Sequence, residues 1–224
     1  MKIIIAGGGI IGKSMVAHLT QNYDVTVIDM DLKNCEEIYT QYSATAIHGD
    51  PKEIRNLKAA GIENADYCIA VADNDSDNLT IAILAKGYNV PYIFVKMNDP
   101  EYETAFKLAG ANNIASSVSM LVNKFVLDIE RPEIRRVASF GEGKAEISIV
   151  ELPKDSMHIG KNIATIGKDI RFPEDCIIAG IYDTKLEELI IPRGHRTVES
   201  GNQLFLVGSA ESVARAHHYF SQKK

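Results

Sequence analysis

Residues 2–31 read KIIIAGGGIIGKSMVAHLTQNYDVTVIDMD, and this stretch decides the fold of the first half of the chain. An apolar run leads directly into Gly7, a helical segment over residues 13–21 follows Gly12, and a second apolar run ends at Asp29. Strand, glycine turn, helix, strand and acid follow one another as in the G-x-G-x-x-G fingerprint, whose acidic residue lies about 20 positions further on. The stretch therefore predicts a dinucleotide-binding βαβ unit.

Each residue of the fingerprint has a physical role. Gly7 permits a sharp turn off the strand, Gly9 lets the backbone approach a pyrophosphate, and Gly12 lets the helix pack closely on the strands. The free N–H groups of the first helical turn favour an anionic phosphate. Asp29 can accept hydrogen bonds from ribose hydroxyls, and Asp31 adds a second negative charge that would repel a 2′-phosphate. These residues predict an adenine-nucleotide site that disfavours NADP.

Composition excludes several classes of protein. The 224 residues suffice for one large or two modest domains, and a net charge of −6 without a basic cluster argues against nucleic-acid binding. Three widely spaced cysteines, Cys35, Cys68 and Cys176, are typical of reduced, buried thiols in a cytosolic protein. The N-terminus leads directly into a core strand and leaves no room for a signal peptide. No apolar run approaches the roughly 18 residues that span a bilayer. We therefore expect a cytoplasmic protein that meets a membrane only through a partner.

Strands and helices continue to alternate after Asp29. We expect strands at residues 44–47, 67–71, 92–95 and 113–115, and helices at residues 32–41, 78–88 and 102–109. A further helix is expected to have Pro51 in its first turn, to carry Ile54 and Leu57 and to stop near Gly61. Repeated βα units with nearly continuous apolar strands form a parallel sheet that is covered on both faces. The first half is therefore predicted to be a Rossmann-like, doubly wound α/β domain with six strands.

The helix expected over residues 119–129 is apolar nearly all round. Such a helix must be buried, and the small sheet before it offers little further cover. We therefore expect it at a subunit or domain interface, with burial in the core of the domain as the alternative. Pro132 ends this helix, and residues 131–136 are predicted to form a polar hinge.

The pattern changes beyond the hinge. We expect strands at residues 145–152, 178–182, 189–191 and 203–207, and a closing helix over residues 210–220. The second half is predicted to be a small α+β module. The expected domains are residues 1–136 and 137–224.

Motifs in both halves carry a resemblance to a known family. The first half holds GGGIIG (7–12), DMD (29–31), HGD (48–50), LKAAGIENAD (57–66) and AVADNDSDN (70–78). The second half holds IGK (159–161), CIIAGI (176–181), LIIPRG (189–194) and ESGNQLFLVG (199–208). With these motifs the chain resembles the RCK family (regulators of potassium conductance), in particular the TrkA- or KtrA-like cytosolic subunits of Trk/Ktr potassium uptake systems.

The resemblance implies a regulatory protein without enzymatic activity. Members of the family form dimers that assemble into a ring, commonly octameric, beneath a membrane-embedded potassium-translocating subunit, and nucleotide binding changes a hinge angle within the ring. By the same resemblance, Gly49, Asp50, Ala72 and Asp73 would border the adenosine, and Lys96 would face the phosphates. The predicted cofactor-binding residues are Gly7, Gly9, Ile10, Ile11, Gly12, Asp29, Met30, Asp31, Gly49, Asp50, Ala72, Asp73, Asn78 and Lys96.

Two departures from the family pattern bear on the ligand. Ktr-type subunits that take ATP carry an Arg where this chain has Ile10, and a Glu that helps to hold a divalent cation near the position of Val118. Both changes lower the positive charge available for a triphosphate, so NAD(H) is favoured and no metal site is predicted. ATP, ADP and AMP stay open as ligands because Lys13 and Lys96 could serve their phosphates.

The rival class is a small NAD-dependent oxidoreductase. Such an enzyme needs a general acid or base near the nicotinamide. The second half offers His158, Lys168 and His195 without a convergent pair, and Tyr92 and Lys96 lie on an expected strand rather than on a helix. We therefore predict no catalytic residue.

A second ligand is a further hypothesis. Asp169 and Arg171 resemble the edge of the cyclic di-AMP crevice of some Ktr-type subunits, with Ile163 and His195 as further lining residues. One Arg from each subunit, meeting across a two-fold axis, could bracket a symmetric dianion. The alternative is that Asp169 and Arg171 order a turn before Phe172.

Overall fold

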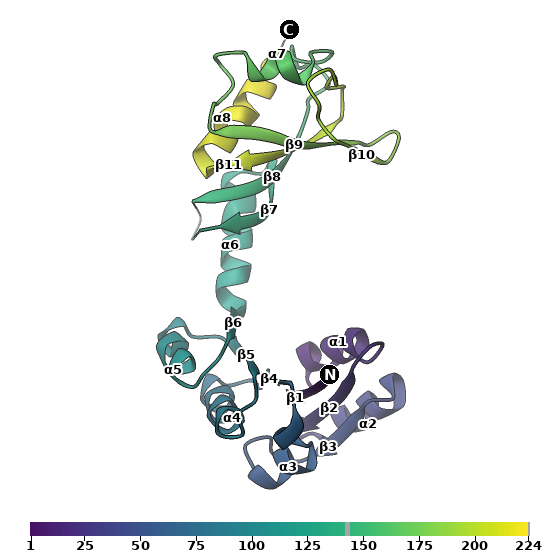
Figure 1. Ribbon diagram of the computed structural model, residues 1–224, viewed down its shortest axis with the longest axis vertical. Helices are drawn as coiled ribbons and strands as arrows, with labels where there is room; N and C mark the ends of the chain where they lie inside the picture. The colour runs from purple at the N-terminus through teal and green to yellow at the C-terminus, as the bar shows by residue number, and fades with distance from the viewer. Residues whose placement is uncertain (142–143, 224) are drawn as a thin grey trace. The chain divides into compact units, whose positions relative to one another are not determined.

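The computed structural model describes residues 1–141 and 144–223 (Figure 1). Contacts within the chain separate two compact units, Met1–Val122 and Asn123–Lys224. The division falls inside α6 (Ser117–Glu130), whereas the boundary expected after residue 136 falls inside β7 (Ile134–Phe140). Residues 117–122 of α6 thus fall in the first unit and residues 123–130 in the second.

The first unit contains the predicted six-stranded parallel sheet. The strand order is β3-β2-β1-β4-β5-β6. The strands are β1 (Lys2–Ala6), β2 (Asp24–Asp29), β3 (Thr45–His48), β4 (Tyr67–Ala70), β5 (Tyr92–Met97) and β6 (Asn113–Ser116). The chain runs outward from β1 in one direction and returns beside it at β4, so the order reverses between these two strands. Ligands of such sheets bind at the carboxyl ends of the strands where the order reverses.

Helices cover both faces of this sheet (Figure 1). On one face Ile3 and Ile5 pack with Val16 and Ile38 of two helices, and on the other face lies a larger core that includes Phe106. This two-sided burial explains the nearly continuous apolar strands. The helices are α1 (Ile10–Leu19), α2 (Leu32–Tyr42), α3 (Ile54–Ala59), α4 (Asp75–Gly87) and α5 (Glu103–Leu108), with short 3₁₀ turns η1 (Ile62–Asn64) and η2 (Pro100–Tyr102).

Three helix starts differ from the prediction. Helix α1 begins at Ile10, directly after the extended residue Gly9, and not at residue 13. Helix α4 begins at Asp75 rather than residue 78, because acidic residues suit the positive end of a helix. Pro51 lies in a turn before α3, where the Asp50 carboxylate accepts a hydrogen bond from the Lys52 N–H at 2.8 Å and fixes that turn.

The apolar residues of α6 have no cover within this chain. None of its described residues is buried, and Phe125 and Ile129 are 60% and 80% exposed. Met120, Leu121 and Val122 are also more than half exposed. A soluble monomer rarely leaves such a patch open, so this helix has the surface that the predicted interface requires.

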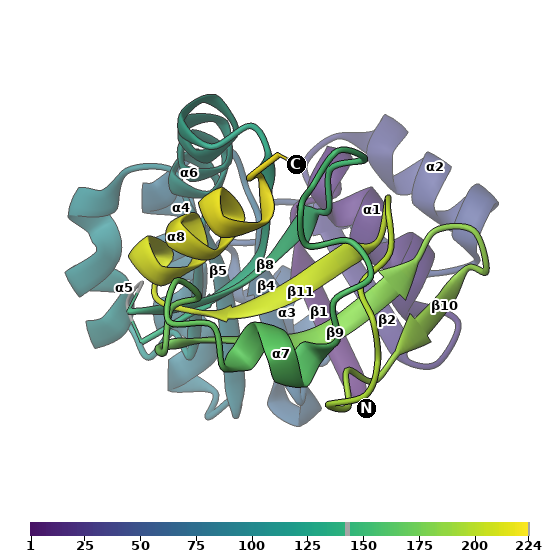
Figure 2. The same cartoon turned by 90° about the horizontal axis from the view of Figure 1, so that it is seen from above.

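The second unit is an antiparallel sheet with one long helix packed on it. The strand order is β10-β9-β11-β8-β7, and Figure 2 shows α8 (Ala210–Phe220) lying across β8 and β11. The strands are β7, β8 (Ala145–Glu151), β9 (Cys176–Asp183), β10 (Glu188–Ile190) and β11 (Gln203–Gly208). The core includes Val150, Leu204 and Leu206 from the sheet and Val213 and Phe220 from α8.

Two elements of this unit differ from the prediction. Residues 134–136 belong to β7 and pair with β8, with Ile134 opposite Val150, so the predicted polar hinge over residues 131–136 is wrong for its second half. The exposed side chains of Arg135 and Arg136 hid this edge strand in the sequence. A short helix, α7 (Ile163–Gly167), was also not predicted, although Asn162 caps it by accepting a hydrogen bond from the Thr165 N–H.

The three cysteines are free and buried, as predicted. Burial raises the pKa of the Cys68 thiol to about 12 and that of Cys176 to about 11. Both thiols are therefore protonated at neutral pH and serve as small apolar core residues.

Candidate nucleotide-binding site

A cleft of 390 Å³ opens at the carboxyl ends of the strands, at the point where the strand order reverses. Its walls come from the loops that follow β1, β2, β3 and β4. The lining residues are Gly7, Gly9, Asp29, Met30, Asp31, Asn34, Asp50, Pro51, Lys52, Val71, Ala72, Asp73, Asn74 and Asp77. Eight of them were predicted from the sequence: Gly7, Gly9, Asp29, Met30, Asp31, Asp50, Ala72 and Asp73.

The glycine turn has the geometry that the fingerprint predicts. Gly7 has φ +116°, and a Cβ there would lie 2.9 Å from the carbonyl carbon and oxygen of Val71. A Cβ on Gly12 would lie 2.0 Å from the Gly7 carbonyl oxygen, so only glycine lets α1 start this close to β1. A Cβ on Gly9 would meet no atom within 4 Å, because this residue faces open space at the cleft.

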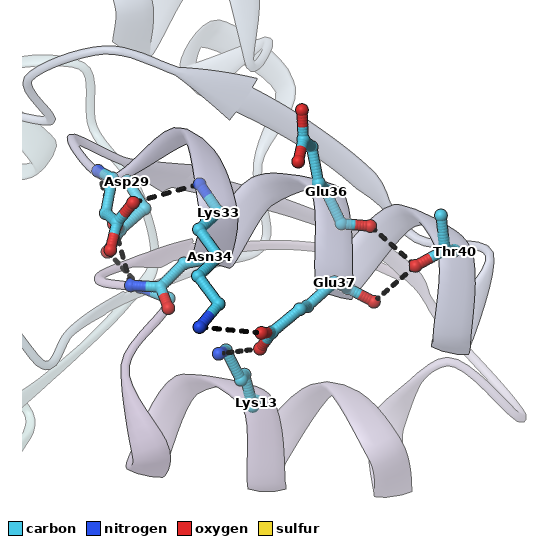
Figure 3. Close-up of polar contacts among 9 residues, drawn as sticks. Lys13, Asp29, Lys33, Asn34, Glu36, Glu37 and Thr40 are labelled. Carbon is cyan, nitrogen blue, oxygen red and sulfur yellow. Dashed lines mark hydrogen bonds and ion pairs between the residues drawn. The ribbon is translucent and has the colours of Figure 1, made fainter.

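Asp29 fixes the turn and the loop after β2. Its Oδ2 accepts a hydrogen bond from the Gly8 N–H at 2.5 Å, and its Oδ1 accepts from the Asn34 side-chain amide at 3.1 Å. Oδ1 also accepts from the Asp31 N–H at 2.8 Å. Figure 3 shows Asp29 beside Asn34 at the start of α2. The carboxylate is therefore held rigidly at the mouth of the cleft, where a ribose would meet an acceptor whose direction is already set.

Asp31 has a structural role in addition to its place on the cleft wall. Its carboxylate caps α2 by accepting from the Lys33 N–H at 2.9 Å. Met30 beside it is 63% exposed, and its carbonyl oxygen lies 3.0 Å from the Nε2 of His48. This contact ties the ends of β2 and β3 together.

Six predicted residues are not among those that line the cleft. Ile10 and Ile11 form a separate shallow apolar hollow on the outer face of α1, together with Met15, His18 and Leu19. Gly12 of α1 lies against Gly7, and Gly49, directly after β3, lies against Asn56. The remaining two, Asn78 and Lys96, are joined to each other by a hydrogen bond.

Asn78 is fully buried and ties β5 to the loop after β4. Its amide nitrogen donates to the carbonyl oxygens of Lys96 and Ala72 at 3.0 and 3.1 Å, and its Oδ1 accepts from the Ala72 N–H at 2.8 Å. The side chain is therefore committed to the protein itself. It holds the cleft wall in place rather than facing a ligand.

Lys52 is a cleft residue that the sequence analysis missed. Its Nζ lies 2.8 Å from the Asp77 Oδ1 and 3.7 Å from the Asp50 Oδ2, so it joins the loop after β3 to the first turn of α4. The hydrogen bond to Asp77 raises the pKa of Lys52, and the same bond lowers the pKa of Asp77. The available signal was its position directly after a strand end, in the loop that begins with Gly49 and Asp50.

Lys13, which was considered as a phosphate ligand, is already paired. Figure 3 shows it reaching from α1 to Glu37 of α2, and Lys33 Nζ approaches the same carboxylate to 3.9 Å. The hydrogen bond from Lys13 lowers the pKa of Glu37. Helices α1 and α2 are thereby joined, and the Lys13 ammonium is drawn away from the glycine turn.

The charge of the cleft wall is mostly negative. Among the described residues that line it, five are aspartates (Asp29, Asp31, Asp50, Asp73 and Asp77) and one, Lys52, is basic. Carboxylates suit hydroxyl donors such as those of ribose, and they repel clustered phosphate charge. The wall therefore suits a ligand with several hydroxyls and few phosphates.

The crevice predicted in the second unit is only partly assembled in the single chain. Ile163 and Asp169 line a hollow of 530 Å³, but Arg171 and His195 line other surfaces. Arg171 instead pairs with Asp169 through two hydrogen bonds, Nη2 to Oδ2 at 2.6 Å and Nε to Oδ1 at 2.9 Å. Tyr219 donates to the same carboxylate at 3.0 Å. These contacts, of which those from Arg171 are the strongest, hold the pKa of Asp169 well below its usual range.

Within residues 1–141 and 144–223, no helix is long and apolar enough to cross a membrane. The same part of the chain brings together no group of three or more His, Cys, Asp or Glu side chains that could hold a metal ion.

The glycine turn, the acid after β2 and the cleft between them define a Rossmann-type nucleotide-binding protein with a second, small α+β unit. Comparison with known proteins identifies the family to which this chain belongs. Residues 3–117 match the TrkA-N domain and residues 147–221 match the TrkA-C domain. The chain belongs to this TrkA family, the RCK family that the sequence motifs resemble.

Several relatives cover nearly the whole chain. It is 29% identical over 222 residues to a Trk system potassium uptake protein TrkA homolog of Methanothermobacter thermautotrophicus, covering 99% of this chain and all of that protein. A TrkA homolog of Archaeoglobus fulgidus is 29% identical over 95% of this chain, which spans only 48% of that relative. The TrkA protein of Mycobacterium tuberculosis is 24% identical over 95% of this chain and 94% of its own length.

Solved structures share the fold. The GsuK RCK domain matches 99% of this chain and 48% of its own chain with a TM-score of 0.65 and 17% identity. A GsuK channel bound to NAD matches with a TM-score of 0.66 and 19% identity, over 99% of this chain and 40% of that one. These matches confirm the predicted order of a Rossmann-like domain followed by a smaller α+β domain.

Proposed function

We propose that this chain is a nucleotide-sensing regulatory subunit that controls a membrane potassium transporter or channel and has no enzymatic activity of its own. One observation carries the proposal: the glycine turn and the fixed Asp29 form a nucleotide cleft in a chain that also holds a TrkA-C domain. The relatives named as Trk potassium uptake proteins support the transport process. Potassium uptake into vesicles that hold the membrane subunit, with and without this chain and nucleotide, tests the proposal directly.

The proposed binding residues fall into three groups. The first contains the eight predicted residues of the cleft wall, which contact the ligand, and we add Lys52 to them. The second contains Ile10, Ile11 and Gly12, whose backbone N–H groups lie in the first turn of α1 and would meet the pyrophosphate. The third contains Gly49, Asn78 and Lys96, which lie behind the cleft wall. Asn78 holds that wall in place without contacting the ligand, and Lys96 is proposed to face the phosphates on the strength of the family resemblance alone.

NAD(H) is the proposed ligand, with ATP, ADP and AMP as competitors. The aspartates of the wall, the pairing of Lys13 with Glu37 and the apolar residue at Ile10 all reduce the positive charge near a triphosphate. One solved structure of GsuK is bound to NAD and another is bound to ADP, which supports both as ligands to compare. Calorimetric titration of the five nucleotides should give the tightest binding for NAD or NADH. Tighter binding of ATP would overturn this assignment.

Assembly is part of the proposal. We propose that the chain dimerises through the exposed apolar face of α6 and forms an octameric ring on the cytoplasmic face of the membrane, whose hinge angle depends on the bound nucleotide. The exposure of Phe125 and Ile129 supports the interface. Light scattering at micromolar concentration should report a dimer or a larger assembly. A stable monomer would contradict the proposal.

Turnover separates a regulator from an oxidoreductase. A regulator binds NADH without consuming it, so absorbance of NADH at 340 nm should stay constant in the presence of candidate carbonyl substrates. Steady oxidation of NADH that depends on protein concentration would show that the chain is an enzyme.

Cyclic di-AMP at the second unit is a further part of the proposed regulation. The family resemblance supports it, whereas the pairing of Arg171 with Asp169 in one chain supports the alternative of an ordered turn. Binding by the full chain that saturates at one ligand per dimer and is lost in Arg171→Ala would establish the site. If cyclic di-AMP produces neither heat of binding nor a thermal shift, the ordered turn is the role of these residues.

A further inference from the structure

A continuous set of hydrogen bonds connects the wall of the cleft to the start of α6. Its centre is Asn98, the residue directly after β5. The Asn98 side-chain amide donates to the carbonyl oxygen of Asp73 at 2.9 Å, and its Oδ1 accepts from the Ser117 hydroxyl at 3.2 Å. Asp73 lines the cleft, and Ser117 is the first residue of α6. One side chain therefore touches both the candidate ligand site and the helix that leads into the second unit.

The backbone of Asn98 is held independently of its side chain. The buried carboxylate of Asp75 accepts from the N–H of Asn98 and from that of Asp99, both at 2.8 Å. Two residues earlier, within β5, the Lys96 carbonyl accepts a hydrogen bond from the Asn78 side-chain amide. Asp75 and Asn78 both belong to the first turns of α4. The loop after β5 therefore moves with the start of α4, which also carries the cleft residue Asp77.

The position of α6 follows from the pairing of β5 with β6. Met97 lies opposite Ser116, the last residue of β6, so Asn98 lies beside Ser117 at the point where the strand becomes a helix. Ser116 caps this helix locally by accepting from the Ser119 N–H. The contact with Asn98 is thus additional to normal capping, and it comes from a different loop.

The chemistry of this contact requires an amide. The Asp73 carbonyl needs a donor and the Ser117 hydroxyl needs an acceptor, and the asparagine side chain offers both at the correct separation. An aspartate of the same shape cannot donate to the carbonyl and would repel it. Alanine reaches neither partner. Asn98→Asp therefore removes the connection with almost no change in volume.

We propose that Asn98 is a positioning residue that couples occupancy of the cleft to the first turn of α6. The proposal rests on the nucleotide-sensing function proposed above and assigns residues to its mechanism. A nucleotide that contacts residues 72 and 73 shifts the Asp73 carbonyl, Asn98 follows this carbonyl because its amide is bonded to it, and Ser117 follows Asn98. The first turn of α6 then takes a different orientation with ligand than without it.

Hydrogen exchange of the full chain tests this coupling. Exchange of amides 117–123 is measured by mass spectrometry with and without saturating NAD, and affinity is measured by calorimetry on the same samples. In the wild-type protein NAD should change exchange in this segment by at least about threefold. Asn98→Asp should bind NAD within about threefold of wild type, yet lose the change in α6.

Two further variants keep the test decisive. Ser117→Ala removes only the hydrogen bond from the Ser117 hydroxyl to Asn98, and it should behave as Asn98→Asp does. If Asn98→Asp fails to fold, Ser117→Ala decides the question alone. Asn112→Ala is the matched control. The Asn112 side chain also bonds to the backbone near β5, since it accepts a hydrogen bond from the Ile93 N–H, but this contact lies at the opposite end of the strand. This control should retain the NAD-dependent change.

The outcomes separate this inference from the function on which it rests. If the wild-type protein binds neither NAD nor any of the other four nucleotides, both are overturned. Two results would overturn the coupling and leave nucleotide binding intact. The first is normal NAD binding by the wild-type protein without a change in hydrogen exchange of α6. The second is a change in exchange as large as that of the wild-type protein in Asn98→Asp and Ser117→Ala.

Discussion

The sharpest test of the glycine turn compares two substitutions three residues apart. Gly9→Ala and Gly12→Ala add the same methyl group to the same motif. The Cβ on residue 9 would meet no atom within 4 Å, and its φ of −68° is open to any residue. The Cβ on residue 12 would lie 2.0 Å from the Gly7 carbonyl oxygen. The two variants should therefore differ in stability although their sequences are nearly the same.

The magnitude follows from the contact that residue 12 makes. The overlap is with a backbone atom that cannot rotate away, since the Gly7 N–H is bonded to the Ile28 carbonyl at 2.9 Å. Overpacking of this kind costs about 3 kcal/mol at the upper end of its usual range. The higher helix propensity of alanine returns about 1 kcal/mol. The net loss of about 2 kcal/mol lowers the melting temperature of a chain of this size by about 4–8 °C.

Thermal unfolding of ligand-free protein, followed by circular dichroism at fixed concentration, measures this difference. Gly9→Ala should melt within about 2 °C of the wild-type protein, as a surface substitution does. A Gly12→Ala variant that melts as the wild type does would refute the close approach of α1 to β1. A Gly9→Ala variant that falls equally far would show that residue 9 does not face open space.

Other predictions concern the ligand, the interface and pH. Asp29→Ala should weaken NAD binding by about 1.5–3 kcal/mol, or about 10- to 150-fold in a calorimetric Kd, as expected for hydrogen bonds to a charged group. Phe125→Asp should reduce the assembly mass in light scattering, because it places a charge on the exposed apolar face of α6; an unchanged mass would contradict the interface. Burial of His158, with the charges of Lys161 and Arg171 as smaller causes, lowers the pKa of this imidazole. The unfolded chain thus binds the proton more readily than the folded protein, so the free energy of unfolding should fall as pH drops below about 6.5. The fall should be at most about 1.4 kcal/mol per pH unit. His158→Phe should flatten this pH dependence in thermal melts between about pH 7.5 and 5.

The fold of the first unit was predictable because its signals are local. Strand β1, which is buried on both faces, is apolar from Ile3 to Ala6 and is followed directly by the glycine turn. Strand β7 was not predictable in the same way. Its exposed edge carries Arg135 and Arg136, and only its pairing with β8, far from any local pattern, makes it a strand.

The candidate site was predictable in part. Gly7, Gly9 and Asp29 act through the backbone next to them, so the motif alone places them on the cleft. Asn78 and Lys52 depend on partners distant in the sequence. The partners of Asn78 are Ala72 and Lys96, and that of Lys52 is Asp77, so residue type alone cannot tell a ligand contact from a structural tie.

Calorimetric titration of NAD into wild-type protein and into Gly9→Val tests the central claim most directly. A Cβ at residue 9 meets no protein atom within 4 Å, so the valine side chain starts in the open space where the pyrophosphate is proposed to lie. We predict saturable binding by the wild-type protein and none by the variant, with melting temperatures within about 2 °C of each other. Equal binding by the two proteins would show that this cleft is not the nucleotide site.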